Sequence, residues 1–181
     1  MHNNFLKKYY FINKFDPDHL IKLSKYVSII YRNYNEKNDE KLIIKIREFC
    51  KKNNKKLFLS NNFKMAIKLD LDGVYLPSFN NEIIPNLYPL KKKFKILGSA
   101  HNLKQITQKQ KQNVSEIFLS SLYKSKESYL GFNKFNKLSK IANVNIIALG
   151  GINQKNIKSL NLLNVRGFAA ISYFKQKKTA P

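Results

Sequence analysis

Eight short apolar runs alternate along this chain with longer polar segments, and this alternation constrains its fold more than any other feature. The runs contain mainly Ile, Val, Leu, Phe and Tyr, residues that favour β-strands. They lie at residues 9–12, 27–31, 57–59, 73–76, 94–97, 115–119, 144–148 and 168–171. The sequence therefore predicts eight strands, spread over nearly the whole length of the chain.

Three of the segments between the runs carry signals for helices. Residues 39–50 have apolar side chains at helical spacing, namely Leu42, Ile43, Ile46 and Phe49. Residues 16–25 begin with Asp16, a candidate helix cap, and with Pro17, which is favoured in the first turn of a helix. Residues 153–160 have the pattern of another capped helix. Strands that alternate with helices indicate βαβ units and a parallel sheet.

Eight such units predict an α/β fold in which the sheet closes into a compact (β/α)₈ barrel, the TIM barrel. Such barrels usually need roughly 200 residues or more. The 181 residues of this chain therefore predict short loops and a short or missing last helix. A chain of this length can bury one core but is short for two, so we expect residues 1–181 to form a single domain.

The charge of the chain is strongly basic, with 34 Lys and Arg against 11 Asp and Glu. Arginine occurs only at Arg32, Arg47 and Arg166, and the lysines are scattered along every segment. Proteins that read nucleic-acid sequences rely on arginine for bidentate contacts and gather their charge on one face. The composition therefore favours a basic surface that attracts small anions, and we expect no specific nucleic-acid partner.

Other classes of protein are excluded by simple features of the sequence. Cys50 is the only cysteine, so there is no disulfide framework and no thiolate metal cluster. Residues 1–13 lack the apolar core and cleavage site of a signal peptide. No apolar run approaches the length of a membrane span. We expect a cytoplasmic protein without a membrane partner, and the sequence predicts no particular oligomeric state.

Several motifs follow one another in a defined order from Tyr10 to Tyr173. They are residues 29–34, which close a strand with Arg32; residues 71–76, Leu-Asp-Gly-Val-Tyr-Leu; residues 98–101, Gly-Ser-Ala-His; residues 117–126; residues 147–153, with Gly150 and Gly151; and residues 167–172. In this order and spacing the chain resembles the thiamine phosphate synthases and the TenI-like thiazole tautomerases. That family has a histidine at the position of Tyr75.

The resemblance implies one of two reactions. In the synthases a pyrimidine diphosphate loses pyrophosphate, and the nitrogen of a thiazole phosphate captures the pyrimidine cation. The tautomerases move a proton on the thiazole phosphate without a metal. Members of both branches bind a phosphate where strands seven and eight end. The expected partners are therefore small phosphorylated substrates.

The expected phosphate site combines two loops at this end of the barrel. Gly150 and Gly151 free backbone amides ahead of a helix that we expect to start at Asn153, and a helix N-terminus attracts anions. Ile171 and Ser172 would supply matching amides after the eighth strand. The alternative interpretation is a plain turn.

Other candidate residues follow strands two, three, five and six. Arg32 would bind a diphosphate, because a planar guanidinium binds phosphate in a bidentate way. The family usually has a lysine where this chain has Tyr34. We expect Ser99 to bind the pyrimidine, and His101 to orient a substrate or act as an acid–base, although it could also be an ordinary polar loop residue. Ser60 and Asn61 are expected to contact the substrate, and Ser125 and Lys126 are expected to contact its phosphates.

The metal site is where the sequence departs from the synthases. They hold Mg²⁺ with aspartates after strands three and four, but here those loops read Ser60-Asn61-Asn62 and, at residues 77–81, Pro-Ser-Phe-Asn-Asn. Mg²⁺ prefers carboxylate and phosphate oxygens. Either the substrate diphosphate carries the metal, or cations alone handle the diphosphate, or the transferase chemistry has been lost. The chain thus resembles a short subgroup without the usual aspartates, and we predict no metal ligands of its own.

Three functions remain open. The first is a thiamine phosphate synthase in which Arg32 and Lys126 bind the diphosphate. The second is a metal-free thiazole tautomerase that uses His101. The third is a non-catalytic protein that binds thiazole phosphate.

Overall fold

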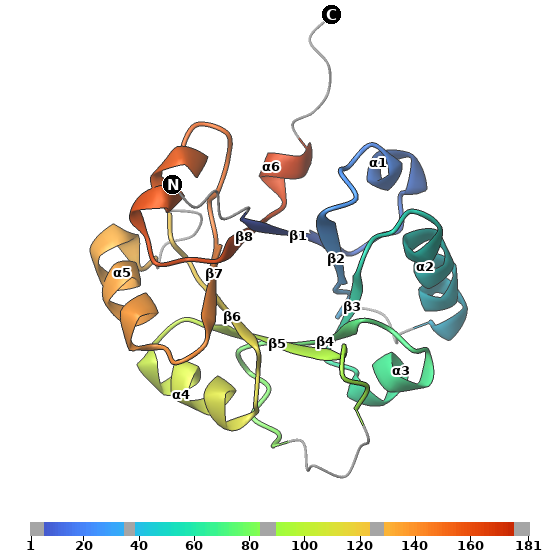
Figure 1. Ribbon diagram of the computed structural model, residues 1–181, viewed down its shortest axis with the longest axis horizontal. Helices are drawn as coiled ribbons and strands as arrows, with labels where there is room; N and C mark the ends of the chain where they lie inside the picture. The colour runs from blue at the N-terminus through green and yellow to red at the C-terminus, as the bar shows by residue number, and fades with distance from the viewer. Residues whose placement is uncertain (1–5, 35–38, 84–89, 124–128, 176–181) are drawn as a thin grey trace, which may run out of the picture.

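The computed structural model describes residues 6–34, 39–83, 90–123 and 129–175. Eight parallel strands pair in chain order, and the last pairs with the first, so the sheet is a closed barrel (Figure 1). The strands are β1 Lys7–Ile12, β2 Val27–Tyr31, β3 Leu57–Ser60, β4 Gly73–Leu76, β5 Lys95–Ala100, β6 Glu116–Leu119, β7 Asn145–Leu149 and β8 Gly167–Ala170. The predicted (β/α)₈ barrel is confirmed.

Helices surround this ring of strands on its outer side (Figure 1). They are α1 Pro17–Ile21, α2 Glu40–Lys52, α3 Phe63–Lys68, α4 Leu103–Lys111, α5 Gly131–Ile141, the 3₁₀-helix η1 Ile157–Leu162 and α6 Ser172–Lys175. Over the described residues, the eighth strand is followed by one helical turn, α6. Across the described ranges, every helix is too short or too polar to cross a membrane.

The predicted helix starts at Asp16 and Asp39 are confirmed. The Asp16 carboxylate accepts a hydrogen bond from the His19 amide at 3.0 Å, and that of Asp39 accepts one from the Lys41 amide at 2.9 Å. Such bonds satisfy amides that have no partner within the first turn of a helix. Helix α1 ends at Ile21, earlier than expected, because the chain turns where the Val27 amide bonds the Ser24 carbonyl.

The predicted helix over residues 153–160 is confirmed only in part: Asn153 caps a turn, but the helix that follows is the 3₁₀-helix η1. Asn153 and Asn156 cap each other there: Asn153 Oδ1 accepts from the Asn156 amide, and Asn156 Oδ1 accepts from the Asn153 amide. This reciprocal pattern is that of a capping box, and the Ile157 amide donates to the Asn153 carbonyl at 3.1 Å, as in a helical turn. The residues form a turn, followed by η1, so no α-helix begins directly after β7.

The barrel interior is packed with side chains, as in other barrels of eight strands. The apolar residues of this interior cluster are Tyr9, Phe11, Ile30, Phe58, Tyr75, Leu97, Phe118, Ile147 and Ala169. The Phe118 ring lies at the centre of this cluster, edge-on to the rings of Tyr9 at 4.9 Å and Tyr75 at 5.4 Å. A second, larger cluster fills the space between the strands and the helices.

The amino-terminal end of the barrel contains a buried carboxylate that the sequence analysis did not single out. Glu116 is 1% exposed and accepts hydrogen bonds from Tyr9 Oη at 2.6 Å and from Lys7 Nζ. Lys95 Nζ lies 3.5 Å from the same carboxylate. Burial, together with the charge of Glu116, raises the pKa of Tyr9. This cluster neutralises a charge inside the barrel, at the end opposite to the carboxyl ends of the strands.

Candidate functional site

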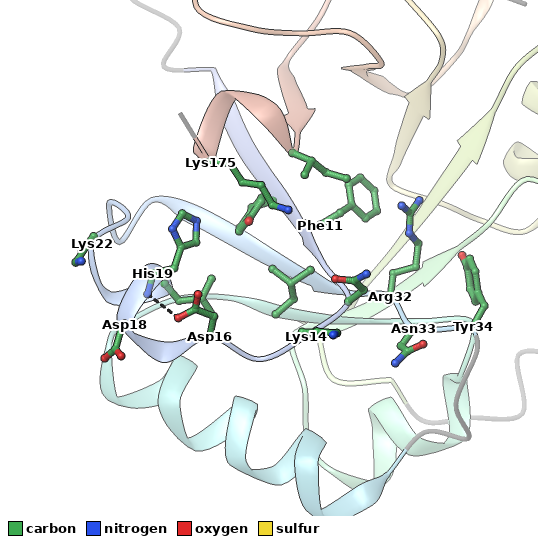
Figure 2. Close-up of a pocket in the computed structure, with 15 residues that line it drawn as sticks. Phe11, Lys14, Asp16, Asp18, His19, Lys22, Arg32, Asn33, Tyr34 and Lys175 are labelled. Atoms are coloured by element: carbon green, nitrogen blue, oxygen red, sulfur yellow. Dashed lines mark hydrogen bonds between the residues drawn. The ribbon is translucent and has the colours of Figure 1, made fainter. Parts of the chain in front are cut away.

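A cavity of about 960 Å³ opens beside the carboxyl ends of β1, β2 and β8 (Figure 2). Active sites of (β/α)₈ barrels lie at this end of the strands. Phe11 and Ile12 of β1 line the cavity, with Arg32 and Tyr34 after β2 and Ile171 after β8. Its cationic side chains are Lys14, Lys22, Arg32 and Lys175, against the carboxylates of Asp16 and Asp18. The excess of positive charge favours an anionic ligand.

Arg32 lies at the mouth of the barrel, as predicted. Its amide donates to the Ile12 carbonyl at 2.8 Å, which fixes the backbone after β2. Its guanidinium lies 4.7 Å from the centre of the Phe11 ring, within the range of a cation–π contact (Figure 2). No acceptor among the described residues binds this guanidinium, so its N–H groups are available to an anionic ligand.

Tyr34 joins the loops that follow three neighbouring strands. Its hydroxyl lies 3.0 Å from Ser60 Oγ, at the end of β3, and its ring packs edge-on against Phe79, in the loop after β4. Ser60 was expected to bind substrate, but its hydroxyl is already paired with Tyr34. Tyr34, which stands where the family usually has a lysine, therefore links the ends of β2, β3 and β4.

Ser99 lies within β5 and not in the loop after it, because β5 extends three residues further than expected, to Ala100. Ser99 is buried and faces Tyr75 of β4. Burial raises the pKa of Tyr75 to about 12, against the opposing effects of its hydrogen bond with Ser99 and the charge of Arg32. Tyr75 is therefore a neutral phenol next to Arg32. Sequence reasoning missed it, although a tyrosine at the position of a family histidine was the signal.

His101 follows β5 and is held by Ser120 at the end of β6. Its Nδ1 lies 3.0 Å from both the carbonyl and the hydroxyl of Ser120. A carbonyl can only accept, so Nδ1 is assigned as the donor, and in that tautomer Nε2 carries the free lone pair. No described residue binds Nε2, which leaves it available as a base, as one of the predicted roles requires.

Gly150 and Gly151 have φ angles of 98° and 70°, which favour glycine. They also pack closely on the loop after β6: a Cβ at Gly150 would lie 2.1 Å from Ser121 Oγ, and one at Gly151 2.7 Å from Tyr123 Cβ. The Tyr123 amide donates to the Gly150 carbonyl at 3.2 Å. Close packing against the loop after β6 thus explains why both positions are occupied by glycine. Their amides bond no acceptor among the described residues, so an anion can still bind them.

The loops after β7 and β8 lie at the same edge of the barrel, because Leu149 pairs with Ala169. Ile171, which is 39% exposed, precedes the first turn of α6, and Ser172 begins it. The structure therefore brings together the two halves of the predicted phosphate site. The N-terminus of an α-helix does not lie at Asn153, because the capped turn there leads into η1. Ser125 and Lys126 lie outside the described residues.

The sequence matches one family model, thiamine monophosphate synthase, over residues 19–174. The chain belongs to the thiamine monophosphate synthase family. No curated protein matches the sequence significantly.

Solved structures share the barrel at low sequence identity. Thiamine phosphate pyrophosphorylase from Pyrococcus furiosus is 19% identical, with a TM-score of 0.71 over 95% of this chain and 92% of that one. The Bacteroides thetaiotaomicron pyrophosphorylase is 15% identical, with a TM-score of 0.60 over 97% and 87%. FabK from Thermotoga maritima is 15% identical, with a TM-score of 0.70 over 93% of this chain and 59% of that one. FabK is therefore the longer protein. These likenesses describe the fold alone.

The loops after β3 and β4, where the resemblance to the synthases led us to look for magnesium ligands, contain Asn61 and Asn80. Asn80 Nδ2 donates to Asn61 Oδ1 at 2.9 Å. Asn80 Oδ1 accepts from Gln112 Nε2 at 2.9 Å and from the Glu82 amide at 3.2 Å. Both side-chain oxygens are therefore used within the protein. Among the described residues no three His, Cys, Asp or Glu side chains gather around a common point. The residues present do not fit a divalent cation.

Proposed function

We propose that the protein joins hydroxymethylpyrimidine diphosphate to thiazole phosphate, which gives thiamine phosphate and pyrophosphate. The observation that carries this proposal is the position of Arg32. Its guanidinium is fixed over Phe11, lines the large cavity and lacks an acceptor among the described residues. Membership of the family supports the same assignment.

Arg32 binds the diphosphate in this proposal. When the bond between the pyrimidine methylene carbon and the diphosphate oxygen breaks, pyrophosphate leaves with the electron pair. Positive charge at the oxygens stabilises this leaving group, and a guanidinium can contact two oxygens at once. Lys126, which lies outside the described residues, is assigned to the same group.

The thiazole phosphate binds across the ends of β7 and β8. The amides of Gly150 and Gly151 and those around Ile171 and Ser172 donate to its phosphate. The thiazole nitrogen then gives its lone pair to the pyrimidine cation, and no proton transfer is needed. Ser99 and Tyr75, which face one another across β4 and β5, hold the pyrimidine ring.

Magnesium has no protein ligands in this proposal, because Asn61 and Asn80 do not fit it. Mg²⁺ would reach the site only as a complex with the substrate diphosphate. The positive charge that the protein itself supplies comes from Arg32 and from the lysines of the cavity, Lys14, Lys22 and Lys175.

The test is thiamine phosphate formation by the purified protein with both substrates at saturation, with and without Mg²⁺. We expect product from the wild type and a loss of at least about 100-fold in kcat/KM for Arg32→Ala, given the usual effect of removing a charge that stabilises a leaving group. Arg166→Ala is the matched control, since Arg166 precedes β8 at the opposite end of the barrel and should keep full activity. Equal activity of both variants would contradict the role of Arg32.

A second candidate function is the metal-free thiazole tautomerase, which the hydrogen-bonded Asn61–Asn80 pair and the free Nε2 of His101 favour. It predicts turnover of a thiazole phosphate tautomer that a chelator leaves unchanged and that His101→Gln abolishes. Binding of thiazole phosphate without turnover in either assay would instead support a binding protein.

A further inference from the structure

A buried lysine lies behind the loops that replace the metal site. Lys109 of α4 is 0% exposed, and a Cβ at Gly98 of β5 would lie 2.9 Å from its Cδ, so Gly98 makes room for it. Its Nζ donates to the Asn80 carbonyl at 2.6 Å and to Gln112 Oε1 at 2.8 Å. Burial of an ammonium group costs free energy unless the group is hydrogen-bonded. These two acceptors therefore hold the Lys109 side chain in this position.

Gln112 extends these contacts along the loop after β4. Its Nε2 lies within hydrogen-bond distance of Asn80 Oδ1 at 2.9 Å, of the Asn80 carbonyl at 3.2 Å and of the Glu82 carbonyl at 2.7 Å. The side chain and the backbone of Asn80 are therefore both held from α4. Asn80 in turn donates to Asn61, in the loop after β3. We call Lys109, Gln112, Asn80 and Asn61 the Lys109 network.

The charge of Lys109 fixes the direction of every hydrogen bond in this network. An ammonium can only donate, so Gln112 must turn its Oε1 toward Lys109 and its Nε2 toward Asn80. Asn80 Oδ1 then accepts, and its Nδ2 must donate to Asn61 Oδ1. Asn61 consequently keeps its other group, the Nδ2 donor, without an acceptor among the described residues.

We propose that the Lys109 network takes the place of a metal ion in this protein. It excludes a divalent cation from the two loops, and it leaves the Asn61 amide N–H group as a donor to an anionic group of the ligand. In the proposed function, on which the identity of that group rests, it is the diphosphate. The loops where the resemblance to the synthases implies a cation thus bind an anion here. Lys109 and Gln112 are positioning residues, and Asn61 is the contact.

The first test measures binding of inorganic pyrophosphate by calorimetry in the presence of EDTA. We expect binding by the wild type and a loss of at least tenfold for Asn61→Asp, which keeps the shape of the side chain and removes the donor. Asn62→Asp is the matched control: it adds the same charge one residue away and still caps α3, where Asn62 accepts from the Met65 amide. Equal losses for the two variants, or wild-type binding that requires Mg²⁺, would overturn the proposal.

Lys109→Met tests the positioning role. We expect a loss of pyrophosphate affinity of several-fold, whereas Lys111→Met, an exposed lysine of the same helix, should change it by less than twofold. Unchanged affinity in a folded Lys109→Met protein would contradict the role of Lys109. If that variant does not fold, Asn61→Asp alone decides, because Asn61 is exposed at the mouth of the barrel.

Divalent-cation binding is tested directly with Mn²⁺, whose free signal is measured by electron paramagnetic resonance. We expect the wild type without pyrophosphate to leave this signal unchanged at millimolar concentrations. Saturable Mn²⁺ binding that Asn80→Ala weakens would overturn the exclusion of the metal. Both readouts are independent of product formation. Pyrophosphate binding without thiamine phosphate synthesis would therefore count against the proposed function and leave the Lys109 network intact.

Discussion

The guanidinium of Arg32 lies 4.7 Å from the centre of the Phe11 ring, at the point where the packed barrel interior ends and the large cavity begins. Phe11 is buried and is itself fixed by edge-on contacts with Tyr75 at 5.1 Å and Phe118 at 6.0 Å. The aromatic core thus fixes the Phe11 ring against which the Arg32 guanidinium packs. A guanidinium held in this way loses less conformational entropy when it binds an anion.

Phe11→Leu should weaken pyrophosphate binding several-fold, because it removes the ring under Arg32, a contact worth about 0.5–1 kcal/mol or more. It should also lower the free energy of unfolding by about 1–2 kcal/mol through the smaller side chain. Phe58→Leu changes the same interior without touching Arg32, and it should lower stability alone. Calorimetry and urea unfolding of both variants measure these effects, and equal affinities would contradict the role of the ring.

Glu116→Gln should lower the free energy of unfolding by about 2–3 kcal/mol, since it removes the charge that binds Lys7 and the Tyr9 hydroxyl inside the barrel. Ligand affinity should not change, because Glu116 lies at the opposite end of the barrel from the cavity. Glu40→Gln breaks an exposed ion pair with Lys68 and should cost less than about 1 kcal/mol. Urea unfolding that gives equal losses for the two variants would show that burial of Glu116 adds nothing.

Gly150→Ala should destabilise the protein by about 3 kcal/mol or more, because the new Cβ would overlap Ser121 Oγ at 2.1 Å in addition to the cost of a positive φ. Gly131→Ala separates the two causes. Gly131 also has a positive φ, of 69°, but its Cβ would meet only Tyr129 at 3.8 Å. We expect that control to lose about 1 kcal/mol. Similar losses in thermal unfolding would mean that the contact with Ser121 is easily relieved.

Lys109 should give the stability of the protein a distinctive dependence on pH. Burial lowers the pKa of Lys109 from 10.5 to about 8. Below about pH 8 both the folded and the unfolded chain carry this proton, so the cost of burying the charge is fully present. Between about pH 8 and 10.5 the unfolded chain binds more protons at this site, and its contribution to stability therefore rises with pH.

The comparison with Lys109→Met isolates this effect from all other titratable groups, because the two proteins share them. The free energy of unfolding of the wild type minus that of the variant should increase from pH 8 to 10.5. Urea unfolding at half-unit steps measures it. If the difference in free energy of unfolding does not change over this pH range, the Lys109 ammonium remains solvated in the folded protein.

The strands were the most predictable part of the fold, because short apolar runs with β-branched and aromatic residues leave few alternatives. Each predicted strand lies within three residues of the observed one. At residues 153–160 the capped start at Asn153 agrees with the sequence pattern, but the turn leads into the 3₁₀-helix η1 and not into an α-helix. Local sequence patterns do not distinguish these two kinds of helix.

The candidate site was predictable only in part. Arg32, Gly150, Gly151, Ile171 and Ser172 do lie at the carboxyl ends of the strands, since the order of strands and loops fixes their place. The pairings Tyr34–Ser60 and Asn61–Asn80 join loops that are distant in sequence and depend on the closed barrel. Lys109 was hidden among many lysines, although its spacing from Ile106 on the buried face of α4 was a usable signal.

The synthase activity is tested by thiamine phosphate formation by the purified wild-type protein from hydroxymethylpyrimidine diphosphate and thiazole phosphate. We expect product, formed at a rate that Arg32→Ala lowers at least about 100-fold and that Arg166→Ala leaves unchanged. No product at saturating concentrations of both substrates, by a folded protein that binds thiazole phosphate, would contradict it.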